Sequence, residues 1–350
     1  MPRVAAYVIS HFYNEEYLLP WWLMHHRELF DHGVLIDYAS TDNSVAICQE
    51  LVPSWTILPS RNAEFNAVSC DEEVMDIERQ LAGWKIALNT SEFLCAIDFG
   101  ALLSDLSASG VSGAFLRGYV MVDSDTMRDV AVDQKRSLVE QRAYGYPEDR
   151  YGTRRALTRS RLLHRMDTGR YSTGRHASPM RNVVWHPPGA ALLWYGFSPW
   201  TKEGRERKLQ VKSRIGELDK LLGLGAQHLV EEADLEFGWQ REVVRAVDLR
   251  TDPAVSSLIR TPDPRVLVGA GFPSSVLQLR TTAVDRRSKS DSLLLRAIES
   301  AQRSERWRSR LLAFYSMWYY RGVRRGALGL MVSPRLSVRV LNRVKPQRMV

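Results

Sequence analysis

Cysteine is scarce in this chain of 350 residues, which contains only three. Cys48, Cys70 and Cys95 are scattered along the sequence and show no C-x-x-C spacing. That pattern argues against a disulfide framework and against a structural zinc site. We therefore expect three buried thiols in a protein that stays in a reducing compartment.

Long apolar runs are also missing. No stretch reaches the roughly 18 consecutive apolar residues that a membrane-spanning helix needs. The N-terminus has no extended apolar segment either, because His11 and the Asn14–Glu16 triplet interrupt it early. An export signal would require such a segment, so the sequence predicts a cytoplasmic protein without a membrane span.

Acidic residues are absent after Glu305, whereas eleven arginines and lysines follow it. The formal charge of +8 therefore resides mainly in the tail. Residues 311–332 place apolar and aromatic side chains at helical spacing beside arginines, which favours a basic helical C-terminal extension over 291–350. Through residues 306–350 this extension could bind an anionic membrane surface and hold the protein at its inner face. The alternative is a helix that packs on the body of the protein. No nucleic-acid-binding module accompanies the charge, so we expect no nucleic acid partner.

Short apolar runs alternate with helical patterns through the first 122 residues, and the hydrophobic content of 45% can fill a large core. The runs lie at 4–10, 33–38, 55–58, 86–88 and 114–122. This alternation predicts an α/β fold with a mostly parallel, Rossmann-like central sheet flanked by helices. We expect a catalytic domain over 1–245, with its nucleotide-binding half at about 1–122, and an irregular linker over 246–290.

Polar side chains follow three of the predicted strands. Asn14 and Glu15 come after the first strand, and the second runs into Asp37, Ser40 and Asp42. The strand at 86–88 ends in Asn89-Thr90-Ser91-Glu92. Ligands of open α/β sheets bind at the carboxyl ends of the strands, so these segments predict a site at that edge.

Together the three segments resemble the family 2-like glycosyltransferases, which have the A-type nucleotide-diphospho-sugar transferase fold. In that family the first strand ends in Asn-Glu, the second in an acid followed by Ser-Thr-Asp, and a later strand in Asp-x-Asp-Glu-Phe-Leu. The match covers about the first hundred residues and is loose beyond 120. The resemblance implies transfer of a sugar from a nucleotide-diphospho-sugar to a glycan or lipid-linked acceptor, with inversion at the anomeric carbon.

The resemblance also implies roles for individual residues. The nucleotide end of the pocket would be lined by Asn14, Glu15, Asp37, Ser40 and Asp42, with Asp37 accepting a hydrogen bond from the base. Asn89 and Ser91 would lie at the donor. Inverting transfer needs a general base, for which the catalytic candidates are Glu92, His176 and Glu78, with Asp219 behind them.

The sequence departs from the family at the metal-binding motif, because Asn89 and Ser91 replace its two aspartates and only Glu92 is retained. Mg²⁺ and Mn²⁺ are held by carboxylates, and neutral amide or hydroxyl oxygens are poorer ligands. The sequence therefore predicts no cofactor with certainty and leaves open whether the protein binds Mn²⁺ or Mg²⁺. Asp98 could belong to a shifted motif, but the register of Trp84 to Leu94 fits the family better.

Without a metal, other cations must neutralise the leaving diphosphate. We name Lys208, Arg214 and His228 as candidates, with Arg205 and Arg207 on the same predicted helix. The alternative for that helix is a solvated charged face. The degenerate motif also admits a second function, in which a catalytically impaired relative binds a nucleotide or glycan within a polysaccharide assembly. A basic membrane-bound scaffold is the third alternative.

Overall fold

The computed structural model describes residues 5–62, 64–148, 159–175, 177–216, 219–220 and 229–259. The chain divides into two compact units, one of residues 1–214 with 227–279 and one of 215–226 with 280–350. All helices and strands named below belong to the first unit. His176, His228 and the predicted C-terminal extension lie outside the described residues.

Four parallel strands form the part of the sheet nearest the N-terminus. Their order is β4-β1-β2-β3, and all three pairings are parallel. The strands are β1 (Ala6–Phe12), β2 (His32–Asp37), β3 (Thr56–Pro59) and β4 (Trp84–Ala87). The central strands of a parallel sheet are buried on both faces, which explains why β1, β2 and β4 read as apolar runs.

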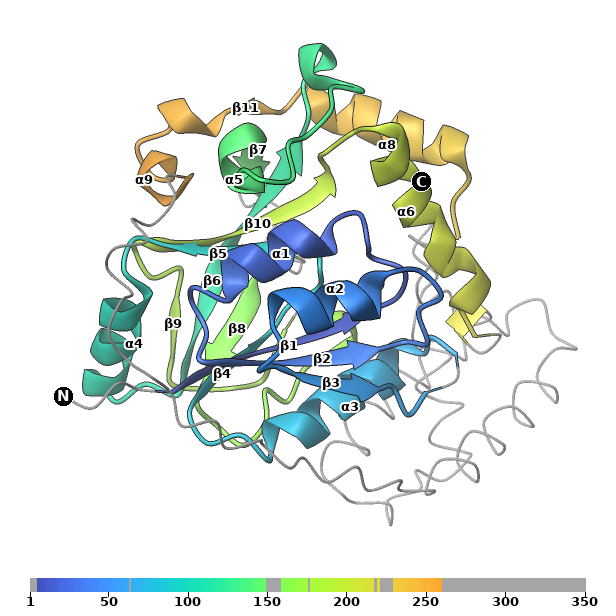
Figure 1. Cartoon of the computed structure of the whole chain (residues 1–350). Coiled ribbons are helices and arrows are strands. Elements are labelled where there is room, and N and C mark those ends of the chain that lie inside the picture. Colours follow the sequence, from blue (N-terminus) through green and yellow to red (C-terminus); the bar gives the residue numbers. More distant parts are fainter. Residues whose placement is uncertain are drawn as a thin grey trace, which may run out of the picture. The chain divides into compact units, whose positions relative to one another are not determined.

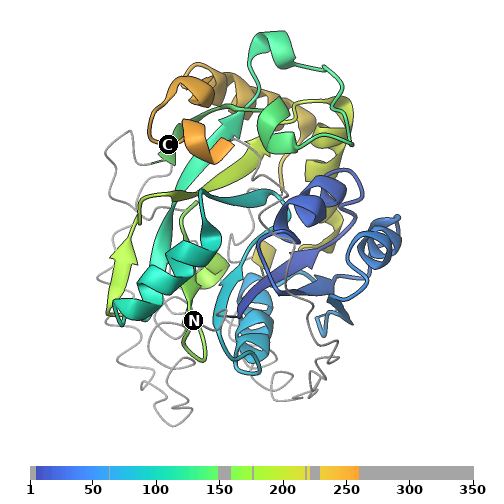
Figure 2. The ribbon, with the colours of Figure 1, turned by 60° about the vertical axis from the view of Figure 1, so that its left-hand side comes forward.

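Helices cover both faces of these strands. On one face Val8 and Leu35 pack in the same core cluster as Trp22 of α1 (Leu19–His26) and Cys48 of α2 (Ser44–Leu51). The two helices lie side by side in both ribbon views (Figures 1 and 2). On the other face Ile9 packs with α3 (Ala67–Glu78). The predicted α/β fold with a helix-flanked sheet is confirmed.

The rest of the sheet brings in antiparallel strands. β8 (Arg161–His164) is antiparallel to both β4 and β6 (Gly113–Val122) and so connects the two parts. β10 (Ala190–Phe197) lies parallel to β6 and antiparallel to β5 (Glu92–Ala96). Three short strands complete the sheet, β7 (Tyr144–Pro147), β9 (Val183–Trp185) and β11 (Val247–Asp248).

Several further helices surround the second part of the sheet. They are α4 (Phe99–Ala108), α5 (Leu138–Gln141), α6 (Lys202–Gln210), α8 (Glu232–Val243) and α9 (Ser256–Ile259), with 3-10 turns η1 (Asp125–Met127), η3 (Thr173–Arg175), η4 (Val211–Arg214) and η6 (Leu249–Thr251). Thr201 caps α6 by accepting from the backbone N–H of Gly204. Trp239 of α8 stacks on Trp200 with ring centroids 5.9 Å apart. Across the described ranges, no helix is both long and apolar enough to cross a membrane.

Helix α1 fixes the position of β5, which begins at Glu92. The indole N–H of Trp22 donates to the carbonyl of Glu92 at 2.9 Å. One turn later, Nε2 of His26 accepts from the backbone N–H of Leu94 at 3.1 Å. Nε2 of His25 lies 2.7 Å from the Leu94 carbonyl oxygen. The first residue of β5 is therefore held rigidly where the β4 segment ends.

Candidate functional site

The loops after β1 and β2 are joined through Asn14. Its backbone N–H donates to Oγ of Ser40 at 3.1 Å, and its Oδ1 accepts from the backbone N–H of Thr41 at 2.8 Å. Asn14 has a φ of 50°, in the left-handed region that asparagine tolerates better than most residues. The structure thus brings together two of the segments that the sequence placed at the carboxyl edge.

Carboxylates organise the same two loops. Oδ1 of Asp37 accepts from the backbone N–H of Ser40 at 2.9 Å. The Asp42 carboxylate accepts from the backbone N–H groups of Glu16 at 3.0 Å and Ser44 at 2.9 Å. Two aspartates therefore shape a continuous rim at the ends of β1 and β2.

Helix α6 joins this rim through Glu15. Nη1 of Arg207 lies 2.7 Å and 2.8 Å from the two carboxylate oxygens of Glu15. The next residue, Lys208, donates from Nζ to the Gly196 carbonyl, and its ammonium lies 5.6 Å from the ring centroid of Trp194. Burial, with Arg207 and then Arg159 as neighbouring charges, lowers the pKa of Lys208 to about 7.

A small pocket lies where the segment after β1 meets the end of β10 and α6. Polar groups from several segments line it, namely those of Tyr17, Ser198, Arg207 and Lys208. The hydroxyl of Tyr17 lies 2.8 Å from Oγ1 of Thr201, the cap of α6. This pocket therefore presents two cationic side chains beside hydroxyl groups.

Arg214 reaches the same edge from η4. Its Nη2 donates to the carbonyl of Tyr38 at 2.9 Å, and its guanidinium lies 5.0 Å from the ring centroid of Tyr13. The Nε of Arg214 is buried and has no hydrogen-bond partner in the described part of the chain. The sequence named Lys208 and Arg214 as diphosphate candidates, and both lie beside the loops after β1 and β2.

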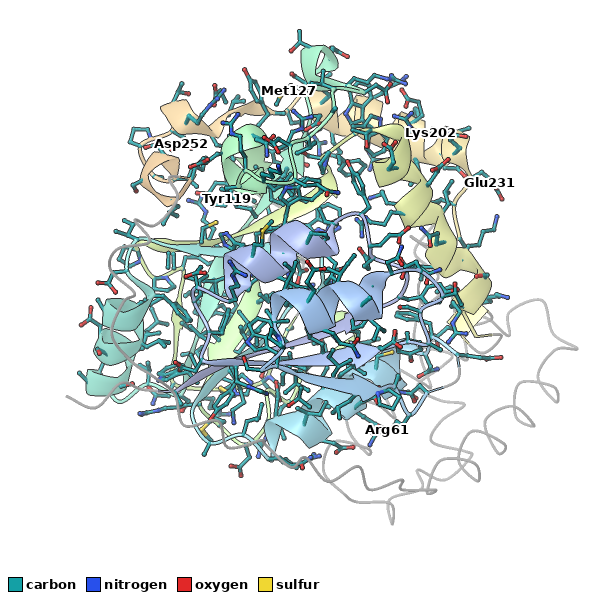
Figure 3. All side chains as sticks on the ribbon, in the orientation of Figure 1. Arg61, Tyr119, Met127, Lys202, Glu231 and Asp252 are labelled. Atoms are coloured by element: carbon teal, nitrogen blue, oxygen red, sulfur yellow. The ribbon has the colours of Figure 1, made fainter. Side chains whose placement is uncertain are left out.

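The third strand end carries a network that the sequence analysis missed. Glu73 of α3 accepts from Oγ of Ser60 at 2.8 Å and from the backbone N–H of Arg61 at 2.8 Å, and lies 3.2 Å from Nε2 of His11. Arg61 is labelled in Figure 3. Burial opposes ionisation, but hydrogen bonds from His11 and its neighbours hold the pKa of Glu73 below its ordinary value. Nothing in the spacing of Glu73 within a helix pointed to this contact.

Glu92, the retained acid of the motif, is wholly buried. Arg161 of β8 donates to both of its carboxylate oxygens, from Nε at 3.0 Å and from Nη2 at 2.6 Å. The backbone N–H of Asn89 also donates to Glu92 at 2.9 Å. These contacts favour a positioning role for Glu92 over proton transfer, because both oxygens are already occupied.

Asn89 contacts a second arginine that the sequence analysis did not name. Nη2 of Arg175 donates to Oδ1 of Asn89 at 2.7 Å, and Nη1 donates to Asp71 at 2.9 Å. Burial alone would lower the pKa of Arg175, but Asp71 and then Glu92 outweigh it and raise that pKa. The arginine-rich run over 159–175 was the available signal, and it did not show which arginine reaches the motif.

The motif does not suit a divalent metal. Both oxygens of Glu92 accept from Arg161, and the side-chain oxygen of Asn89 accepts from Arg175. Only the neutral hydroxyl of Ser91 is then left from the motif positions, and hard cations prefer carboxylates. Within the described ranges, no group of three or more His, Cys, Asp or Glu residues could hold a metal ion.

Glu78 lies away from the carboxyl edge. It ends α3, seven residues after Asp71, which corresponds to roughly 10 Å along the helix axis. Its buried carboxylate accepts from the hydroxyl of Tyr171 at 2.6 Å and the backbone N–H of Gly169 at 2.7 Å, and lies 3.1 Å from Nε2 of His164. The structure therefore does not bring Glu78 to the other site residues, and its contacts stabilise the far end of α3.

No family model and no curated protein matches this chain. Among solved structures, S. aureus TarS has a TM-score of 0.33 and 10% identity, covering 90% of this chain and 52% of that one. The chain thus spans about half the length of that TarS chain.

Two further solved structures contain bound molecules. S. aureus TarS 1–349 in complex with UDP has a TM-score of 0.32 and 10% identity over 92% of this chain and 89% of that one. The glucosyl-3-phosphoglycerate synthase of Mycobacterium tuberculosis, in complex with Mn²⁺, UDP and glucosyl-3-phosphoglycerate, has a TM-score of 0.27 and 9% identity over 46% and 57% of the two chains.

Proposed function

We propose that this protein is a glycosyltransferase that moves a sugar from a nucleotide-diphospho-sugar to a glycan or lipid-linked acceptor. One observation carries the proposal. The segments that resemble the glycosyltransferase family at the ends of β1 and β2 form one hydrogen-bonded rim through Asn14, Ser40 and Thr41. Ligands of α/β sheets bind at such carboxyl edges, which supports a donor site there.

Different site residues would contact different parts of the donor. Asp37 would accept a hydrogen bond from the base, while Asn14, Ser40 and Asp42 hold the loops that surround the nucleoside. Glu15 would act through Arg207 by holding α6 against this rim. The diphosphate would lie near the motif positions Asn89 and Ser91, with Lys208 and Arg214 as its cationic neighbours.

The reaction is a single displacement with inversion. The acceptor hydroxyl oxygen attacks the anomeric carbon as the bond from that carbon to the diphosphate oxygen breaks. The electron pair leaves with the nucleoside diphosphate, and the acceptor proton passes to a general base. Glu92 and Glu78 are both wholly buried and hydrogen-bonded, so we assign them structural roles. His176 stays the predicted base, outside the described residues.

The acceptor class rests on the basic tail. Residues 306–350 lie outside the described residues, and their contact with an anionic membrane stays a prediction. If that contact forms, the protein would work at the inner face of the membrane on a lipid-linked acceptor. A soluble glycan is the alternative acceptor.

Donor turnover tests the proposal. The purified chain is incubated with a panel of nucleotide-diphospho-sugars, and release of nucleoside diphosphate is measured, since slow donor hydrolysis requires no identified acceptor. We expect release from one nucleotide family. Donor binding without release, with or without glycan and lipid acceptors, would instead support the catalytically impaired relative. If the chain neither binds a donor nor releases nucleoside diphosphate, the proposal is overturned.

A further inference from the structure

We infer that Arg175 is a built-in cation at the position where the family resemblance implies a divalent metal, so that the donor diphosphate binds without metal. The inference rests on the proposed function, because it concerns the diphosphate of the same donor. It adds a residue that the sequence did not identify, and it explains why Asn89 and Ser91 can replace two aspartates.

The side-chain oxygen of Asn89 already has a cationic partner. At the motif, Oδ1 of Asn89 accepts from the Arg175 guanidinium at 2.7 Å. An aspartate here would pair with that guanidinium and lose its availability to a metal. Asparagine offers a neutral oxygen that accepts from the Arg175 guanidinium, and it adds no negative charge that would attract a metal. The substitution therefore matches the arginine that contacts it.

The buried carboxylates beside the motif are balanced by arginines. Arg175 pairs with Asp71, and Arg161 pairs with Glu92, so each buried carboxylate beside the motif already has a cation. A further guanidinium, that of Arg159, lies 3.3 Å from the ring centroid of Trp194, which is directly opposite Glu92 in the β5–β10 register. A divalent cation would therefore meet carboxylates that are already paired with arginines.

Arg175 has N–H groups that its contacts with Asp71 and Asn89 do not use. Arg175 is 7% exposed, and its Nε has no hydrogen-bond partner among the residues that the structure describes. Guanidinium has five N–H groups in a planar fork that suits phosphate oxygens. The contacts to Asp71 and Asn89 use two of its nitrogens. Arg175 therefore keeps hydrogen-bonding capacity close to the motif.

Calorimetric titration of the full chain with nucleoside diphosphates tests this inference, in EDTA and again in Mn²⁺. We expect one nucleotide to bind with a Kd that differs by less than about twofold between the two buffers. Arg175→Gln should weaken that binding at least tenfold in EDTA. Arg142→Gln is the matched control, because Arg142 is similarly buried beside Asp123 at 3.4 Å and, among the described residues, makes no contact with the motif. The control should lose stability without losing affinity.

The possible failures can be told apart. Binding that requires Mn²⁺ would overturn the inference and leave the proposed function standing, whereas no nucleotide binding in either buffer would overturn the proposed function itself. If Arg175→Gln does not fold, Asn89→Asp with Ser91→Asp in the presence of Arg175 replaces it. This variant should gain little Mn²⁺ affinity, measured by the electron paramagnetic resonance of free Mn²⁺. A tenfold gain would contradict the inference.

Discussion

Arg207 contacts both carboxylate oxygens of Glu15 from a single nitrogen, at 2.7 Å and 2.8 Å, across 192 positions of sequence. The contact joins α6, which follows β10, to the loop after β1. Because Lys208 is the next residue of α6, the same ion pair sets the distance of that lysine from the rim. One ion pair therefore connects the nucleotide end of the candidate site with its candidate diphosphate end.

Glu15→Gln should lower the free energy of unfolding by about 3 kcal/mol, because it leaves Arg207 charged and largely buried without its carboxylate. The side chains of Glu15 and Arg207 are 10% and 11% exposed. Glu28→Gln is the control, since Glu28 pairs with Arg27 at the surface, where loss of the pair should cost less than about 1 kcal/mol. Urea denaturation measures both. Equal losses of unfolding free energy in the two variants would contradict a stabilising, largely buried Glu15–Arg207 ion pair.

Lys208 should make stability depend on pH above neutrality. Its folded pKa is about 7, below the ordinary value of 10.5. Between these values the unfolded state binds the proton and the folded state does not, so stability contributed at Lys208 rises with pH from about 7 upward. The unfolding free energies of the native chain and of Lys208→Met are measured from pH 6 to 9.5. Above about pH 7, that of the native chain should rise relative to that of Lys208→Met. Lys202→Met, at an exposed position of α6, should follow the native profile; if Lys208→Met does so too, the lowered pKa is refuted.

Asp37→Asn should weaken nucleotide binding about 10- to 100-fold, the cost of losing a hydrogen bond to a charged acceptor. Asp98→Asn is a close match, because Asp98 also accepts a backbone N–H three residues on, at 2.8 Å, but at the start of α4. Titration calorimetry compares the two variants. If Asp98→Asn loses more nucleotide affinity than Asp37→Asn, the shifted motif around Asp98 is favoured.

Glu92→Gln separates positioning from proton transfer. If Glu92 holds Arg161, the variant should lose about 3–5 kcal/mol of unfolding free energy, since a buried charge is left unpaired. Glu92→Leu combined with Arg161→Met should recover much of that loss. A variant of native stability that no longer releases nucleoside diphosphate would show instead that Glu92 is the base.

The sequence predicted the parallel half of the sheet because each buried strand is a short apolar run. β1, β2, β3 and β4 all lie within two residues of their expected positions. Helix α3 begins at Ala67, because Asn66 caps it by accepting from the backbone N–H of Ser69. β8 was missed, since Arg161 and His164 interrupt its apolar pattern at both ends.

The strand-end residues of the candidate site were predictable because they are local in sequence. Asn14, Asp37 and Ser40 could be named because polar residues follow strands. Arg175 and Arg161 could not, because each reaches the motif from at least 69 residues away and many other arginines surround them in the sequence. A sequence pattern shows the ends of strands, but the ion pairs across the sheet depend on tertiary packing.

A thermal-shift screen tests the central claim, a nucleotide-sugar donor site at the carboxyl edge, most directly. The purified chain is heated with each common nucleoside diphosphate and nucleotide sugar at about a hundredfold excess over Kd, where a ligand specific for the native state adds about 2.7 kcal/mol of stability. We predict that one nucleotide family raises the Tm of the native chain and has a smaller effect on Asp37→Asn. If no nucleotide shifts the Tm of the native chain, the account of this edge as a donor site is contradicted.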